Sequence, residues 1–190
     1  LNRLMQEARG ETFILCHQDV RLLGETRKDL EQRLAELGDR EPRWAVAGNA
    51  GGKSPGVLAI RISDGHGANV KLGELPESVG SLDENFLIVR PSAGLAFSAD
   101  LEGFHFYGTD ICLVADTLGH TAHVIDFHLE HLSKGNIRSQ GFKTAEQAFR
   151  AKWSRALRPR WVQTTCSLLY LSGQPLVHAV FNAGRRVAAA

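Results

Sequence analysis

The chain is poor in several features that mark particular classes of protein. Only 3 of its 190 residues are cysteine, in no CxxC or other regular pattern, which argues against a disulfide framework and favours a reducing, cytoplasmic setting. Its apolar runs are all shorter than the roughly 18–20 residues that span a bilayer, so we expect no membrane span. Neither charge sign dominates, with 22 Lys+Arg against 21 Asp+Glu. That balance argues against nucleic acid or an anionic membrane as a partner.

What the chain does have is the apolar content and the periodicity of a globular α/β protein. Hydrophobic residues make up 43% of it, enough for one substantial core. Strand and helix patterns alternate, with no internal repeat. The predicted strands are 12–16, 44–47, 57–62, 86–89 and 123–129, and the predicted helices are 25–37, 107–118 and 144–157. Thr144 and Gln147 form a capping box for the last helix, whereas residues 161–171 suit either a strand or a helix.

The first candidate site follows the predicted strand 12–16. His17-Gln18-Asp19 comes directly after this buried strand, and ligands of open α/β sheets gather where strands end. A carboxylate there can bind a hard divalent cation that also holds phosphate groups. The alternative is that Asp19 is a solvated loop residue.

A second group of acids surrounds the predicted helix 107–118. Asp110 falls in its first turn, where the helix dipole favours a negative charge and a carboxylate can accept a proton from an attacking hydroxyl. The alternative is that Asp110 only stabilises the start of the helix. Asp100 and Glu102 precede this helix, and Asp83 and Glu84 precede the strand 86–89, so all four are candidates to frame the same pocket.

A third group is rich in histidine. It contains the histidines His120, His123, His128 and His131 together with Asp126 and Glu130. These side chains cannot all face one metal on a straight strand, and there is no HExxH spacing. A zinc hydrolase is therefore a distant hypothesis. A single histidine joining Asp19 at a metal is the better one.

One phosphate-binding motif is rejected. Gly52-Lys53-Ser54 fits a loose P-loop pattern, but Pro55-Gly56 and a period-two strand follow it where a P-loop needs a helix. We expect 48–56 to be a mobile glycine-rich loop and Lys53 to be solvated.

Four segments, in this order, resemble motifs of family 2 glycosyltransferases, which have the GT-A fold, and most of all their small StrF-type subgroup. They are residues 8–20 (ARGETFILCHQDV), 81–86 (SLDENF), 104–113 (FHFYGTDICL) with Gly119, and 124–133 (VIDFHLEHLS). The resemblance covers residues 1–135. It departs from the family pattern where His17 replaces the first acid of the DxD motif, where Thr109 precedes the base, and where no opening strands precede Leu1.

The resemblance implies a GT-A-like, Rossmann-like mixed sheet flanked by helices and incomplete at its N-terminus. Residues 1–135 would form the catalytic and acceptor portion, and residues 136–190 a C-terminal helical extension packed on the same domain. The implied activity is metal-dependent transfer of a sugar from a nucleotide-sugar donor to an unknown hydroxyl acceptor, with inversion.

The same resemblance implies a role for each candidate residue. Asp19 and His131 would bind the divalent metal, Mn²⁺ or Mg²⁺, and Asp110 would be the catalytic base. The residues implied to bind substrate are His17, Asp83, Glu84, Asp100 and Glu102. The alternative is a non-catalytic binding or scaffold module derived from the same fold, and the sequence leaves the oligomeric state open, a homo-oligomer included.

Overall fold

A computed structural model of the chain describes residues 1–133, 139–156, 158–163, 168–172, 174, 176, 177 and 180. The chain divides into two compact units, Leu1–Glu146 and Gln147–Ala190. All of the candidate site residues belong to the first unit.

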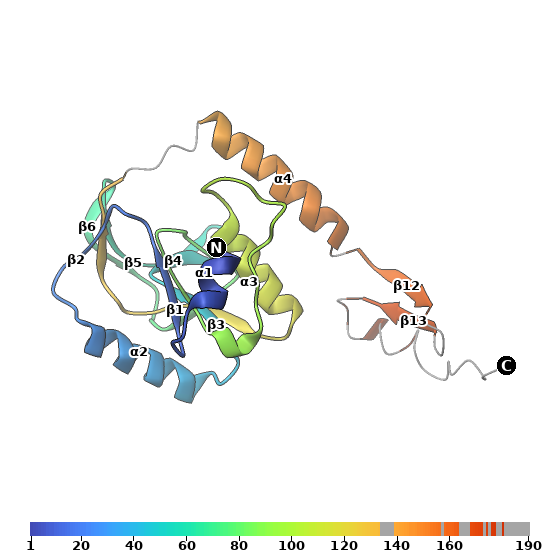
Figure 1. The fold of residues 1–190 in the computed structure, drawn as a ribbon, viewed down its shortest axis with the longest axis horizontal. Coiled ribbons are helices and arrows are strands. Elements are labelled where there is room, and N and C mark those ends of the chain that lie inside the picture. Colours follow the sequence, from blue (N-terminus) through green and yellow to red (C-terminus); the bar gives the residue numbers. More distant parts are fainter. Residues whose placement is uncertain are drawn as a thin grey trace. The chain divides into compact units, whose positions relative to one another are not determined.

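The first unit contains both helices and strands, which follow one another along the chain without strict alternation (Figure 1). Its elements are α1 (Asn2–Glu7), β1 (Phe13–Cys16), β2 (Val20–Leu22), α2 (Arg27–Arg40), β3 (Trp44–Gly48), β4 (Ala50–Ser54), β5 (Val57–Asp64), β6 (Gly67–Leu72), β7 (Glu77–Val79), β8 (Ser81–Leu82), β9 (Phe86–Val89), the 3₁₀ turn η1 (Pro91–Ala93), α3 (Tyr107–Thr117), β10 (Thr121–Val124) and β11 (Leu129–His131). Helix α4 (Gln140–Ala156) begins in this unit, and β12 (Arg160–Gln163) and β13 (Leu168–Leu171) form an antiparallel pair in the second.

The strands of the first unit form two mixed sheets. The five-stranded sheet has the order β1-β9-β3-β10-β7, in which only β3 and β10 run parallel. The other sheet has the order β2-β11-β5-β4-β8 with β6 paired to β5, and its one parallel pair is β11 and β5. The protein is therefore an α/β protein with mixed sheets flanked by helices, as the sequence predicted.

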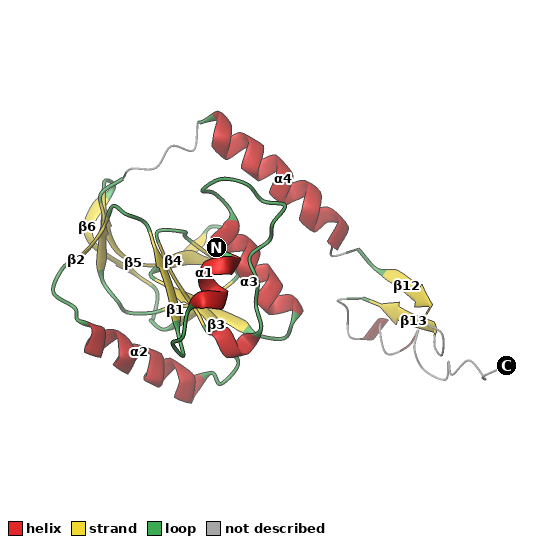
Figure 2. Cartoon of the chain, in the orientation of Figure 1, coloured by secondary structure: helices red, strands yellow, loops and turns green. Residues whose placement is uncertain are grey.

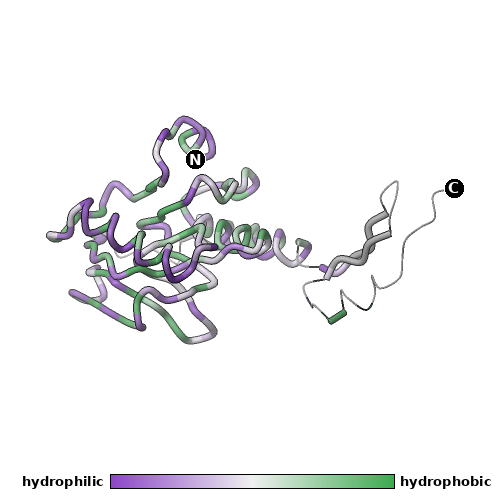
Figure 3. The backbone as a smooth tube through the Cα atoms, turned by 90° about the horizontal axis from the view of Figure 1, so that it is seen from below, coloured by the Kyte–Doolittle hydropathy of each residue, from purple (hydrophilic) through white to green (hydrophobic). Residues whose placement is uncertain are grey.

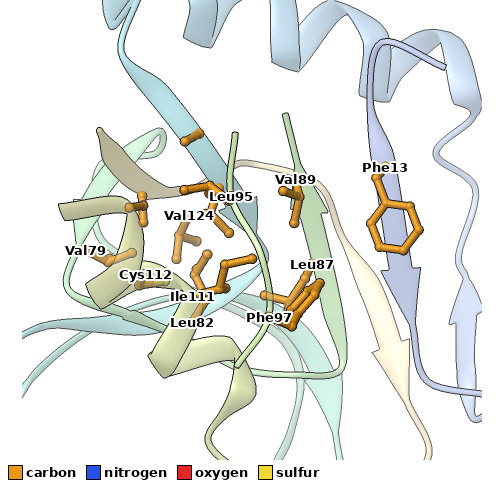
Figure 4. Close-up of a cluster of buried hydrophobic side chains, with 14 of the residues drawn as sticks. Phe13, Val79, Leu82, Leu87, Val89, Leu95, Phe97, Ile111, Cys112 and Val124 are labelled. Atoms are coloured by element: carbon orange, nitrogen blue, oxygen red, sulfur yellow. The ribbon is translucent and has the colours of Figure 1, made fainter. Parts of the chain in front are cut away.

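The five-stranded sheet is buried on both faces because a helix packs on each. Leu87 and Val89 of β9 join Ile111 and Cys112 of α3 in one apolar cluster (Figure 4). The alternate β9 residues Phe86 and Ile88 join Leu30 and Leu37 of α2 in the other cluster. This explains why β9 is apolar at every position. Figure 2 shows the helices α2 and α3 in red and the strands in yellow.

Helix α2 begins at a capping box. The Thr26 hydroxyl accepts a hydrogen bond from the Asp29 amide, and the Asp29 carboxylate accepts one from the Thr26 amide. Leu30 and Leu37 lie on the face that packs against the sheet.

Three elements differ from the sequence prediction. Residues 50–54, expected as part of a loop, form β4, and glycine is required at 51 because a Cβ there would lie 2.2 Å from the Ser81 carbonyl oxygen of β8. The expected strand 123–129 is interrupted, so that β10 and β11 join different sheets. Helix α4 begins at Gln140, one turn before Thr144, with the Ser139 hydroxyl accepting from the Phe142 amide.

In the C-terminal region, residues 136–190 were expected to form a helical extension in which 161–171 could be strand or helix. The described residues there form α4, the strands β12 and β13, and helical positions at 176, 177 and 180. Hydrophilic and hydrophobic residues are interleaved along the described backbone (Figure 3), and no described helix is long and apolar enough to cross a membrane.

Candidate metal centre and acidic cleft

The chain reverses direction between β1 and β2 at residues 17–19. The Val20 amide donates to the His17 carbonyl at 3.3 Å, which closes the turn, and the His17 amide donates to the Asn85 carbonyl at 2.9 Å. The turn is thereby held against the residue that precedes β9. Both His17 and Asp19 are partly buried.

Strand pairing brings His131 to this turn, although it lies more than a hundred residues further along the chain. Strand β11 pairs antiparallel with β2, with His131 opposite Val20. The Leu132 amide then donates to the Asp19 carbonyl at 3.0 Å. His131 and Asp19 are neighbours because of this register, which sequence periodicity does not reveal.

Among the described residues, His17, Asp19 and His131 form the one group of three side chains with metal-binding atoms close together, all within 4.8 Å of one another. Ligand atoms bound to one ion at about 2.0–2.2 Å lie about 3–4 Å apart, so a small contraction would suit a cation. His131 Nε2 and Asp19 Oδ1 are 3.3 Å apart, and neither buried atom has a hydrogen-bond partner in the described part of the chain. The predicted pairing of Asp19 with His131 is thus present in the geometry.

Tyr107 orients the third side chain. Its hydroxyl donates to the Glu84 carbonyl at 3.3 Å and lies 3.1 Å from His17 Nε2. Because the Tyr107 hydroxyl donates its proton to the Glu84 carbonyl, it can only accept a hydrogen bond from His17. The favoured tautomer of His17 therefore carries its proton on Nε2 and leaves the Nδ1 lone pair for a metal. Burial, followed by the charge of nearby His131, lowers the pKa of His17, so the ring is neutral near pH 7, the form that binds metals.

A cleft of about 360 Å³ adjoins the triad and shares His131 with it. Three acids line this cleft, Asp64, Asp83 and Glu84, together with Thr109 at the start of α3. Its apolar lining comes from β5, β8, the segment before α3 and the first turn of α4, and it includes Leu58, Ile60, Leu82, Phe106 and Phe142. A cavity with an apolar wall and a few convergent polar groups is the usual form of a small-molecule site.

Glu84 is the most perturbed acid of this cleft. Its Oε1 accepts a hydrogen bond from the Gly108 amide at 3.1 Å. Burial, and then the neighbouring negative charge of Asp83, raise the pKa of Glu84 to about 7. Asp83 itself is exposed, and its Oδ1 accepts from the backbone amide and the side-chain amide of Asn85 at 2.9 and 2.6 Å.

The structure separates the other predicted site residues from this group. Asp110 is 1% exposed and packs on the buried side of α3, and it does not line the cleft. Asp100 and Glu102 are exposed on the segment before α3 and also lie outside the lining. The acids around α3 were proposed to frame one pocket, but of these only Asp83 and Glu84 line the cleft.

The remaining histidines of the third group have other surroundings. His123 lies on β10 in the five-stranded sheet, where its Nε2 contacts the Thr121 hydroxyl at 3.0 Å. His128 Nε2 contacts the Ser63 hydroxyl at 2.9 Å. Lys53 is paired with Glu77 at 2.8 Å. The expectation that only one histidine of this group would join Asp19 agrees with these positions.

Sequence reasoning missed two polar residues of this region. Tyr107 was predicted only as the start of a helix, and Asp64 lay just beyond the predicted strand 57–62 and was given no role. Each reaches the region through pairing or packing between distant segments, which leaves no local signal in the sequence.

Comparison with known proteins adds a family but no activity. No family model matches the chain. The chain is 34% identical over 177 residues to a protein of Fuscovulum blasticum named ATP synthase subunits region ORF 6, a match that covers 90% of this chain and 71% of the relative. The chain therefore belongs to the same family as that protein, whose name states no chemical activity.

Proposed function

We propose that the protein is a metal-dependent glycosyltransferase that uses a nucleotide-sugar donor, with a GT-A-like fold. The observation that carries this proposal is the convergence of His17, Asp19 and His131 beside a cleft lined by carboxylates. The motif resemblance also supports it, because the segments that carry the motifs supply the triad and two of the three acids of the cleft, Asp83 and Glu84.

The three side chains suit a divalent cation. Asp19 supplies one carboxylate, His17 and His131 supply imidazole nitrogens, and the unpartnered Asp19 Oδ1 and His131 Nε2 atoms would gain a partner. A bound cation would supply positive charge to a diphosphate leaving group. Mn²⁺ and Mg²⁺ are the proposed cofactors.

The cleft would hold the transferred sugar and the acceptor hydroxyl. Asp64 and Asp83 offer carboxylate oxygens that accept hydrogen bonds from sugar hydroxyls, and Leu58 and Phe106 offer apolar surface to the faces of the ring. His131 belongs to both the cleft and the triad, so a donor in the cleft would have its diphosphate near the cation.

The proposal is tested with the purified chain, Mn²⁺ and a set of UDP- and GDP-sugars, by measuring release of the nucleoside diphosphate. Asp19→Asn and His131→Ala should each reduce turnover by at least about tenfold, as expected when a metal site is weakened. His66→Ala is the matched control, since His66 is exposed in the turn between β5 and β6.

The alternative is a binding or scaffold module that keeps the fold without catalysis. It predicts no turnover with any donor and no Mn²⁺-dependent binding of UDP or GDP by calorimetry. A donor site is supported if the unmodified chain shows turnover or metal-dependent nucleotide binding and Asp19→Asn loses it. If the unmodified chain shows neither, the enzyme proposal is overturned.

A further inference from the structure

We infer that Glu84, and not Asp110, is the residue that accepts the proton of the attacking hydroxyl. This inference rests on the proposed glycosyl transfer and assigns one step of it. The acceptor oxygen would form a bond to the anomeric carbon as the bond from that carbon to the diphosphate oxygen breaks. The electron pair of the broken bond leaves with the diphosphate, and the proton of the hydroxyl passes to the Glu84 carboxylate.

Position is the first argument. Glu84 lines the cleft that also contains His131, so its carboxylate is open to a molecule bound beside the triad. Its main chain is linked to the triad as well, because the Tyr107 hydroxyl donates to the Glu84 carbonyl and contacts His17. The acid and the metal ligands are thus fixed to one another through a single tyrosine.

The fold shapes a place for this carboxylate. Gly108 lies so close to Glu84 that a Cβ at position 108 would be 3.3 Å from Oε1 and 2.5 Å from the Leu82 carbonyl oxygen. The absence of a side chain lets the Gly108 amide reach Oε1 at 3.1 Å. Such a bond orients the carboxylate without protonating it.

The acidity of Glu84 suits the same role. Burial and Asp83 raise its pKa to about 7, and a general base works best when its pKa is close to the working pH. The ionisable groups around it from neighbouring elements are Asp64, Asp83, His105, Tyr107, Cys112 and His131. Burial raises the pKa of Tyr107 and of Cys112, so both are neutral near pH 7.

Asp110 has the opposite environment. It is 1% exposed, beside Ile111 and Cys112 on the face of α3 that packs on the sheet. Its neighbour Thr109 is the α3 residue that lines the cleft. A hydroxyl bound in the cleft would therefore lie beside Glu84 and not beside Asp110.

The experiment compares Glu84→Gln, Asp110→Asn and the control Glu74→Gln, an equivalent substitution on an exposed loop residue. Nucleoside diphosphate release from a UDP- or GDP-sugar that the unmodified chain uses is measured from pH 5 to 9 with Mn²⁺. Glu84→Gln should lower kcat by about 10²-fold or more, the usual contribution of a general base, with KM within about threefold. In the unmodified chain, kcat should rise with pH around a midpoint near pH 7, as Glu84 loses its proton. In Asp110→Asn, kcat per folded molecule should fall by less than about tenfold and should show the same rise with pH.

Mn²⁺ binding by Glu84→Gln, measured by calorimetry, separates loss of chemistry from loss of fold, and it should match the unmodified chain within about twofold. If Glu84→Gln turns over normally and Asp110→Asn does not, the assignment of the base is wrong while the proposed transfer stands. If the unmodified chain turns over no donor and binds no nucleotide with Mn²⁺, the proposed function itself fails and this assignment fails with it.

Discussion

At the residue scale, the features that set this site apart are the raised pKa of one carboxyl group and the imidazole of His17, which stands where the resembled motif has an acid. The pKa of Glu84 is raised because folding buries its carboxyl group beside Asp83. His17 stands at the first position of the motif and is held by Tyr107. Each residue leads to its own measurable consequence.

Glu84 should make the stability of the fold depend on pH. Its pKa rises from 4.5 to about 7 on folding, so the folded chain keeps a proton that the unfolded chain has released, and stability falls as pH rises from about 4.5 through 7. Glu84→Gln removes this pH-dependent loss of stability, and its amide oxygen can still accept the hydrogen bond from the Gly108 amide. Its free energy of unfolding should match that of the unmodified chain near pH 4.5 and exceed it by about 1–3 kcal/mol at pH 8. Urea unfolding at both pH values measures this, and an equal difference at both would contradict the raised pKa.

His17 should set the choice of metal. Imidazole nitrogens suit Zn²⁺, Co²⁺ and related ions, whereas Mg²⁺ prefers oxygen ligands. A triad of His17, Asp19 and His131 should therefore bind Mn²⁺, Co²⁺ or Zn²⁺ more tightly than Mg²⁺. His17→Asp should shift the ratio of the Mg²⁺ and Co²⁺ dissociation constants towards Mg²⁺ by about tenfold, or about 1.4 kcal/mol.

Calorimetric titration of each ion into the metal-free chain measures that ratio. His66→Asp is the matched control, because it adds the same charge at an exposed turn outside the triad. An unchanged ratio in His17→Asp would show that His17 is not a ligand.

At the scale of elements, the site depends on how α3 approaches β8. Gly108 opens the first turn of α3 and lies against the Leu82 carbonyl and the Glu84 carboxylate. Phe106, the N-cap of α3, has a φ of +68°, a left-handed conformation that is rare outside glycine. The first turn of α3 therefore lies so close to β8 that there is no room for a side chain at position 108.

Gly108→Ala should destabilise the first unit, because its Cβ would lie 2.5 Å from a backbone carbonyl that cannot move aside easily. A loss of about 1–3 kcal/mol is expected, as for other overpacked sites. Gly141→Ala is the control, since nothing lies within 4 Å of a Cβ there and the residue is in helix α4. It should be neutral or slightly stabilising. The melting temperatures of the two variants, measured by thermal unfolding, test this expectation. Equal melting temperatures for Gly108→Ala and Gly141→Ala would mean that α3 and β8 are not in close contact.

Elements were also the level at which the sequence was most informative. The sequence predicted a strand at 86–89 and a helix at 25–37, and both are present as β9 and α2. The strand at 12–16 was expected to be buried, but β1 lies at the edge of its sheet with Ile14 and Cys16 exposed. The glycine-rich segment at 50–54 was misread, because glycine there serves the close approach of β8 and not a mobile loop. Asp19 and His131 were predicted as partners, but only the β2 and β11 register explains their contact, and Asp110 was placed by its motif without any signal that packing would bury it.

At the scale of the molecule, binding at the triad should stabilise the whole first unit. The triad joins the turn after β1 to the end of β11, and these elements belong to different sheets. A ligand that binds only when both are in place adds its binding energy to folding, about 2.7 kcal/mol at a hundredfold excess over the dissociation constant.

The corresponding rise in melting temperature for Mn²⁺ or Co²⁺ is about 5–10 °C at that excess. Asp19→Asn should abolish most of the rise, because it removes the one carboxylate of the triad, while His66→Ala should keep it. Differential scanning calorimetry of the metal-free chain with increasing metal measures the effect without any donor or acceptor, so the result is independent of catalysis. A rise that persists undiminished in Asp19→Asn would place metal binding elsewhere in the chain and remove the main support for the proposed donor site.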